Sequence, residues 1–141
     1  MDTLKISGRE KQSIYLDVKK WAASRMGLSS QSLQVDDKEA GLLLYKCNFQ
    51  YDAAPFNPGT AYSGYISFVL EINVSDSICA LSVSSMYHSA TNSANSGGYF
   101  SNKKPDFSLL GGGKKKWERI QKDGYHKVFT MFLDIESYLK K

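Results

Sequence analysis

Three consecutive runs of alternating apolar and polar residues, at 42–51, 64–75 and 78–88, limit the folds that this chain can adopt. Side chains on a β-strand point to opposite faces in turn, so each run predicts a strand with one buried face. The predicted inward residues are Leu43, Tyr45, Cys47, Phe49 and Tyr51, then Ile66, Phe68, Leu70, Ile72 and Val74, then Cys79, Leu81, Val83, Ser85 and Tyr87. Strands with one polar face favour an antiparallel sheet that is covered on one side only.

A helix is expected before these strands, over residues 9–26, because apolar residues recur there at intervals of three and four. The apolar stripe consists of Ile14, Val18, Trp21 and Ala22. Gly27 follows at a position where helices commonly stop. Ser7 is expected to cap the start of this helix, with Glu10 as its capping-box partner.

The end of the chain also has helical spacing, in two pieces. Trp117 and Ile120 predict a short helical turn, which Gly124 is expected to interrupt. From Tyr125 onward, apolar residues continue mostly on one face to the end of the chain. A second amphipathic helix is therefore predicted to close the fold.

With short strands expected at 3–7 and 33–36, the predicted order is β-α-β-β-β-β-α. Two amphipathic helices on one face of a single antiparallel sheet make a two-layer α+β domain. The length of 141 residues suits one domain over 1–141, and a composition of 42% hydrophobic and 23% charged residues excludes a disordered chain. A turn-rich connection is expected at 52–61 and a long flexible loop at about 89–113.

The two cysteines are predicted to be free. Cys47 and Cys79 are too few for a disulfide scaffold or an all-cysteine zinc site. Both face inward on strands that the 64–75 strand separates, which places them roughly 9–10 Å apart. A disulfide needs Cα atoms within about 7 Å, so two buried thiols are expected.

Several short motifs together resemble a known family. They are the helix with Tyr15 and Trp21, the turn DKEAG at 37–41, the strand pair after it and the closing helix. Over about residues 14–87, and less clearly in the last helix, the chain is similar to the uncharacterised bacterial domain-of-unknown-function family with a TBP-like fold. The resemblance implies the architecture given above and no established activity.

The cellular location of the protein is predicted from the same resemblance and from the first residues of the chain. No run of 18 apolar residues occurs, so a membrane-spanning helix is not predicted. The first residues are polar, with no signal-peptide core. Members of the family usually carry a secretion or lipoprotein leader. The expectation is therefore the cell envelope or secretion if a leader has been removed, and the cytoplasm otherwise.

Residues that could carry chemistry are sparse. The chain has two histidines, His88 and His126, and neither has a cysteine or a second histidine at the spacing of zinc ligands. The sequence also lacks the Gly-x-Ser-x-Gly motif that would mark a nucleophilic serine. We expect them at the surface or at strand ends, with a small hydrolase or isomerase site near His88 as an alternative. Asp36, Asp37 and Glu39 form an acidic turn without EF-hand spacing, which favours a solvated turn. No metal or cofactor is predicted.

Excess positive charge is concentrated in residues 103–127. This segment holds eight lysines and arginines against three acids, a net charge of +5, whereas the rest of the chain has −1. The glycines at 111–113 lack the residues that a phosphate loop needs, so they are interpreted as a linker. Lys114, Lys115 and Lys116 then begin a helix, where positive charge opposes the helix dipole and favours a bound anion.

The sequence argues against nucleic acid as the main partner. The basic segment 103–127 contains aromatic residues, as nucleic-acid surfaces do, and binding through it stays an alternative. However, TBP itself uses two fused repeats and apolar wedges, and one copy makes half of such a saddle. The outward face of the predicted strands is polar but not basic.

An apolar patch on the outward face of the sheet is the main candidate for a contact site. Its residues are Leu42, Leu44, Tyr65, Val69 and Met86. The alternative is that the 89–113 loop folds back and covers this patch with Tyr99, Phe100 and Phe107. We therefore predict a non-enzymatic binding or interaction module that uses the open sheet face or the loop. Its partner would be a protein or small ligand, or a second copy through the outer face.

Overall fold

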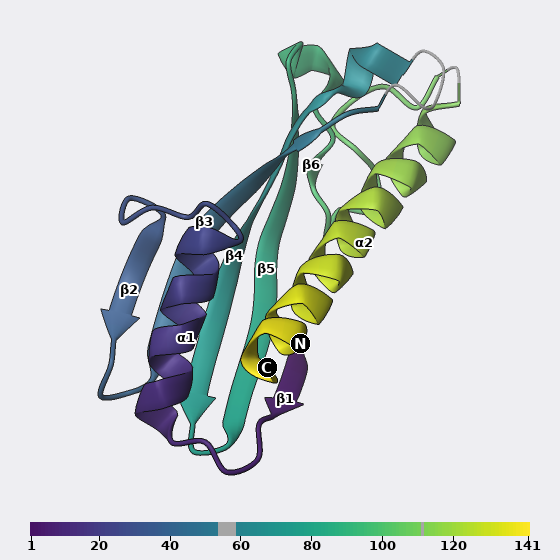
Figure 1. The fold of residues 1–141 in the computed structure, drawn as a ribbon. Helices are drawn as coiled ribbons and strands as arrows, with labels where there is room; N and C mark the ends of the chain where they lie inside the picture. The colour runs from purple at the N-terminus through teal and green to yellow at the C-terminus, as the bar shows by residue number, and fades with distance from the viewer. Residues whose placement is uncertain (54–58, 111) are drawn as a thin grey trace. The chain divides into compact units, whose positions relative to one another are not determined.

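The computed structural model describes residues 1–53, 59–110 and 112–141. In chain order the elements are β1 (Asp2–Lys5), α1 (Lys11–Ser24), β2 (Leu33–Asp37), β3 (Leu42–Tyr51), the 3-10 turn η1 (Gly59–Tyr62), β4 (Gly64–Ser75), β5 (Ile78–Ala90), the 3-10 turn η2 (Ser93–Asn95), β6 (Gly98–Tyr99) and α2 (Gly113–Leu139) (Figure 1). In this described part, six strands form one antiparallel sheet of order β1-β5-β4-β3-β2, with β6 paired to β5 outside that path. The predicted α+β class is confirmed, and β6 is an additional strand.

The described residues group into two compact units. The first contains residues 1–47, 69–84 and 128–141, and the second contains 48–68 and 85–127. A single domain over 1–141 stays a prediction.

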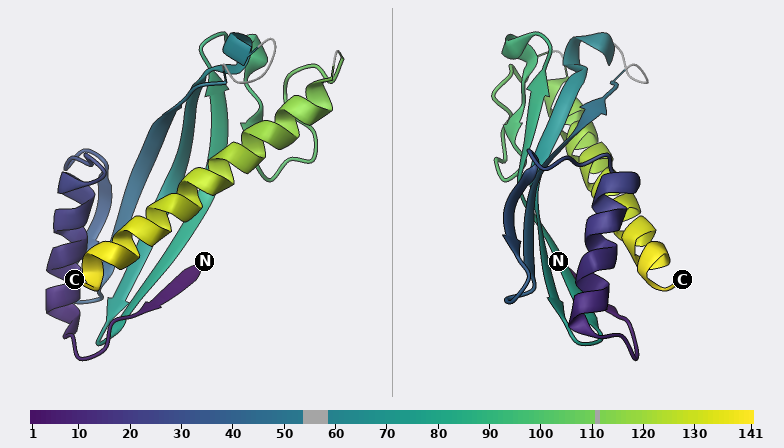
Figure 2. Two further views of the ribbon diagram at one scale, coloured as in Figure 1. Left: turned by 45° about the vertical axis from the view of Figure 1, so that its right-hand side comes forward. Right: turned by 60° about the vertical axis from the view of Figure 1, so that its left-hand side comes forward.

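In the first unit, the helices lie on one face of the sheet. β1 pairs with β5, with Leu4 opposite Cys79, and β2 pairs with β3, with Asp37 opposite Leu42. Figure 2 shows α1 and the last turns of α2 on the same side of these strands. Fully buried side chains between the two layers include Ile14, Val18, Trp21, Leu43, Ile72, Cys79 and Ile135. The two-layer arrangement predicted from the apolar stripes is thus present in this unit.

Both cysteines are buried and free, as predicted. Burial raises the pKa of the Cys47 thiol and of the Cys79 thiol to about 12. Both groups therefore stay protonated at neutral pH, and a protonated thiol is neither a good nucleophile nor a metal ligand. Their role here is to fill the core.

The start of α1 differs from the prediction. Ser7 does not cap the helix: Glu10 occupies the N-cap position without a side-chain cap bond. Instead, Asp76, from the turn between β4 and β5, accepts a hydrogen bond of 2.8 Å from the backbone N–H of Lys11. A carboxylate at this place also complements the positive end of the helix dipole. The cap comes from a residue 65 positions away, so local sequence could not reveal it.

A polar contact joins α1 to α2 within the same unit. The indole Nε1 of Trp21 donates to Asp134 Oδ2 at 2.8 Å, and Arg25 Nη2 lies 2.6 Å from Asp134 Oδ1. The hydrogen bonds from Arg25 and Trp21 lower the pKa of Asp134 below its usual value. Trp21 is completely buried, so its polar N–H needs this partner.

In the second unit, strand β5 reverses its inward face at Ser85. This residue has φ of +55°, a left-handed conformation that is uncommon for a side chain other than glycine. Ser85 itself is exposed; after it, Met86 and His88 are buried and Tyr87 is half-buried. The predicted inward positions Ser85 and Tyr87 are therefore wrong, because one irregular residue shifts the alternation as a β-bulge does.

The predicted helix break at Gly124 is also wrong, because α2 continues through this residue. Gly124 is buried, and a Cβ there would lie 2.5 Å from Cε2 of Phe100 and 3.3 Å from Cε of Met86. Glycine lets the Phe100 ring approach the helix backbone. Its presence inside the helix is explained by close packing rather than by a helix end.

The segment predicted as a long loop at 89–113 contains defined structure. β5 continues to Ala90, and β6 pairs with β5 through Tyr87–Tyr99 and His88–Gly98. Phe100 and Phe107 are buried and lie edge-on to Trp117 of α2, with ring centroids 5.6 and 6.1 Å apart. These two rings pack beside α2, so the prediction that they cover the outward face of the sheet is wrong for Phe100 and Phe107. Tyr99 is exposed and lies edge-on to Tyr87.

Two predicted connections extend beyond the described residues. Within the connection at 52–61, residues 54–58 lie outside the described part of the chain, and within the glycine linker at 111–113 the same is true of Gly111.

Gly41 provides a test of the packing at the turn between β2 and β3. Gly8 and Gly41 have nearly the same φ, +75° and +74°, but a Cβ at 41 would lie 2.1 Å from the carbonyl oxygen of Val74, whereas one at Gly8 meets nothing within 4 Å. Both Gly→Ala variants pay about 1 kcal/mol for the left-handed backbone. We expect Gly41→Ala to lower the free energy of unfolding by roughly 2 kcal/mol more than Gly8→Ala. Urea denaturation measures the difference, and equal losses would contradict the close approach.

Candidate functional site

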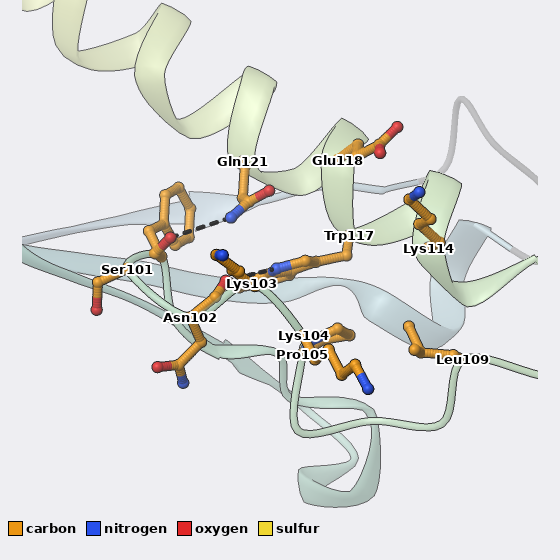
Figure 3. A pocket seen from close by; sticks show the side chains of 11 residues that line it. Ser101, Asn102, Lys103, Lys104, Pro105, Leu109, Lys114, Trp117, Glu118 and Gln121 are labelled. Atoms are coloured by element: carbon orange, nitrogen blue, oxygen red, sulfur yellow. Dashed lines mark hydrogen bonds between the residues drawn. The ribbon is translucent and has the colours of Figure 1, made fainter.

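An open pocket of about 550 Å³ in the second unit is the candidate site among the residues that the structure describes (Figure 3). It lies between the segment after β6 and the first turns of α2. The residues that line it are Phe100, Ser101, Asn102, Lys103, Lys104, Pro105, Leu109, Lys114, Trp117, Glu118 and Gln121. Its volume falls within the range of small-molecule sites, about 300–1,000 Å³.

Two hydrogen bonds fix the shape of this pocket. Trp117 Nε1 donates to the carbonyl oxygen of Asn102 at 3.3 Å, and Gln121 Nε2 donates to the carbonyl oxygen of Phe100 at 3.0 Å (dashed lines in Figure 3). Both donors belong to α2, and both acceptors belong to the backbone of the facing segment. The indole is almost completely buried, so it forms a rigid wall and not an adaptable one.

The charged side chains at the pocket have an excess of positive charge. Among the described residues that line it, Lys103, Lys104 and Lys114 stand against Glu118, a net charge of +2. Lys103 and Lys104 come from the segment after β6, and Lys114 comes from the first turn of α2. A helix N-terminus carries partial positive charge from its free N–H groups, so it adds to the attraction for an anion.

The structure separates the three lysines that were predicted to bind an anion. Lys114 lines the pocket. Lys115 is exposed and does not line it, and Lys116 lies over the ring of Tyr62, with Nζ 5.2 Å from the ring centroid. Lys103 and Lys104 were not singled out individually, although the basic segment 103–127 includes them. Only the chain reversal between β6 and α2 brings them opposite Lys114.

The predicted outward patch loses one of its five residues in the structure. Met86 is buried, with 7% exposure, so its assignment to the patch is wrong, and the reversal at Ser85 is the reason. The remaining residues are Leu42, Leu44 and Val69, half-buried in the first unit, and Tyr65, exposed in the second. A contact role for these four residues stays a prediction.

His88 is a structural residue. It is fully buried, its Nε2–H donates to the carbonyl oxygen of Tyr62 at 2.8 Å, and its Nδ1 accepts from the backbone N–H of Gly97 at 2.9 Å. Burial lowers the pKa of His88. Both ring nitrogens are thus used by backbone groups in the neutral tautomer, which leaves neither available as a general base. His88 is therefore not at the surface but lies close to the end of β5, the other position expected for it, whereas His126 is exposed.

The acidic turn is occupied by local partners. Asp36 accepts a hydrogen bond from the Tyr15 hydroxyl and lies 2.6 Å from Lys19 Nζ, and these two contacts lower its pKa. Asp37 Oδ1 accepts from the backbone N–H of Ala40 at 2.9 Å. Across the described residues, no group of three or more His, Cys, Asp or Glu side chains is placed to hold a metal ion.

Comparison with known proteins gives the family. The family model for the domain of unknown function DUF4468, with TBP-like fold, matches residues 1–89. The chain belongs to this family. No curated protein matches the DUF4468 chain. In the parts of the chain that the structure describes, no helix is both long and apolar enough to span a membrane.

Two solved structures share the fold of this DUF4468 chain. A TBP-like protein from Parabacteroides distasonis is 14% identical with a TM-score of 0.67, and the match covers 99% of this chain and 90% of that one. A DUF4468 family protein from Bacteroides ovatus is 10% identical with a TM-score of 0.71, covering 99% of this chain and 84% of that one. The resemblance expected from the sequence motifs is therefore confirmed. The similarity of fold also covers the segment beyond residue 89, where the pocket lies.

His88 predicts a pH dependence of stability. Its folded-state pKa lies below the ordinary value of 6.5, so the unfolded chain binds a proton that the folded chain excludes. The free energy of unfolding should fall as the pH drops from 7.5 to 5.5, by at most about 1.4 kcal/mol per pH unit. Denaturation of the wild type, His88→Gln and the control His126→Gln at each pH tests this. We expect a smaller slope only in His88→Gln, and an unchanged slope there would contradict the assignment. If His88→Gln does not fold, NMR titration of the wild-type His88 ring provides the same test.

Proposed function

We propose that this protein is a non-enzymatic binding module that holds a small anionic ligand in the pocket beside Trp117. The observation that supports this most directly is that three exposed lysines and the buried Trp117 line the same pocket. Lys103 and Lys104 belong to the segment after β6 and Lys114 to the first turn of α2, and their ammonium groups point to different sides of the pocket (Figure 3). Family membership is consistent with this proposal but names no ligand.

The lining indicates the chemical class of the ligand. Lysine ammonium groups attract phosphate, sulfate or carboxylate as point charges and impose little geometry. Trp117, Pro105 and Leu109 add apolar surface to the same pocket. A compact anion with a small apolar portion would contact both the lysines and the apolar side chains of the pocket.

Binding without catalysis fits the residues present. Among the described lining residues, none is a histidine or a cysteine. Nucleophilic catalysis needs a nucleophile within hydrogen-bond reach of an activating base. The amide of Gln121 and the indole N–H of Trp117 are already committed to backbone carbonyls, so they hold the pocket in shape.

The test uses inorganic pyrophosphate as a probe, followed through the NMR signal of the Trp117 indole. The double variant Lys103→Gln/Lys114→Gln should raise the dissociation constant roughly fivefold to thirtyfold, because it removes two exposed charge contacts of about 0.5–1 kcal/mol each. Lys115→Gln is the matched control for the single variant Lys114→Gln: each removes one charge from the first helical turn, and only Lys114 lines the pocket. Binding should also weaken as salt concentration rises.

Two outcomes would contradict the proposal. One is the absence of any saturable shift of the Trp117 signal at low salt. The other is an equal loss in Lys115→Gln, which would indicate general attraction to the basic segment. A parallel titration with a single-stranded oligonucleotide tests nucleic-acid binding. If the oligonucleotide shifts NMR signals throughout residues 103–127 and pyrophosphate shifts none, nucleic acid is favoured instead of a small anion.

A further inference from the structure

The solvent-facing side of α2 carries three large apolar residues in a row. Tyr125, Phe129 and Leu133 are 53%, 59% and 50% exposed and are spaced by four residues. Residues three or four apart are neighbours on a helix surface, so the three form one stripe. The buried residues of the same helix, such as Met131 and Ile135, lie on another face. A polar surface is expected opposite the core, and an apolar stripe there indicates a contact surface.

Charged residues extend this stripe in a symmetric pattern. Counting outward from Phe129 toward the N-terminus, the steps of four, three and four residues reach Tyr125, Lys122 and Glu118. The same steps toward the C-terminus reach Leu133, Glu136 and Lys140. Because all seven residues lie on one continuous helix, their common face follows from helical geometry alone.

The charges in this pattern are self-complementary. When a second copy of α2 is placed antiparallel with the two Phe129 residues in contact, Tyr125 faces Leu133 and Lys122 faces Glu136. At the ends, Glu118 faces Lys140. In a parallel pair each residue would face its own copy, which brings like charges together. The pattern therefore favours an antiparallel, two-fold symmetric pair.

We propose that two copies of this protein associate through α2, antiparallel and centred on Phe129. Within one chain, Lys140 already lies 2.5 Å from Glu136, so Lys122 of the second copy would extend an alternating row of charges. The apolar contact is limited to three side chains per copy. The area buried is therefore smaller than the roughly 800 Å² per partner of a stable complex, and the pair should be weak and dependent on concentration.

Sedimentation equilibrium over a wide range of protein concentration tests the association. The wild type should show a reversible monomer–dimer equilibrium. Phe129→Glu should weaken it at least about tenfold, since it places two carboxylates at the centre of the contact. Leu16→Glu is the control, because Leu16 is also an exposed apolar helix residue, 45% exposed, but lies on α1. A wild type that stays monomeric at every concentration would overturn the proposal.

Charge reversal tests the antiparallel register. Lys122→Glu and Glu136→Lys should each weaken the dimer severalfold, because each places like charges opposite one another. The double variant Lys122→Glu/Glu136→Lys restores opposite charges across the contact and should recover most of the affinity. Failure of the double variant to recover, with circular dichroism showing an intact helix, would rule out this register. Neither residue lines the pocket beside Trp117, so the outcome is independent of anion binding.

Discussion

The left-handed backbone at Ser85 is the constraint on which the second unit depends. It turns Met86 and His88 inward, where each holds part of the following segment: the carbonyl of Met86 accepts from the N–H of Phe100, and His88 accepts from the N–H of Gly97. Together with the pairing of β5 and β6, these two bonds attach residues 97–100 to β5, and Phe100 and the residues after it form the side of the pocket that faces Trp117.

Different faces of α2 perform different tasks. One face is buried and includes Trp117 and Gly124, which receive the aromatic rings of the segment after β6. The other carries the exposed stripe centred on Phe129. The proposed ligand site and the proposed dimer contact share Glu118, which lines the pocket and also ends the charged row.

Much of the fold could be predicted because its strands are long and regular. The strands at 42–51 and 64–75 were predicted with the bounds that the structure shows, since alternation over ten residues or more leaves little room for another register. The errors occur where one residue departs from its local preference. Ser85 adopts a conformation typical of glycine, and Gly124 occupies the middle of a helix that its propensity disfavours.

The candidate site was less predictable than the fold. A local charge count identified the basic segment, but the pocket requires Lys103 and Lys104 to lie opposite Lys114, and this depends on hydrogen bonds between residues 15 and 21 positions apart. Composition and periodicity by themselves determined the α+β class, the buried free cysteines and the location of the charge, because these follow from local spacing. Only the tertiary structure decided which charges meet, which aromatic rings are buried and which helix face stays open, because these depend on contacts between residues distant in the chain.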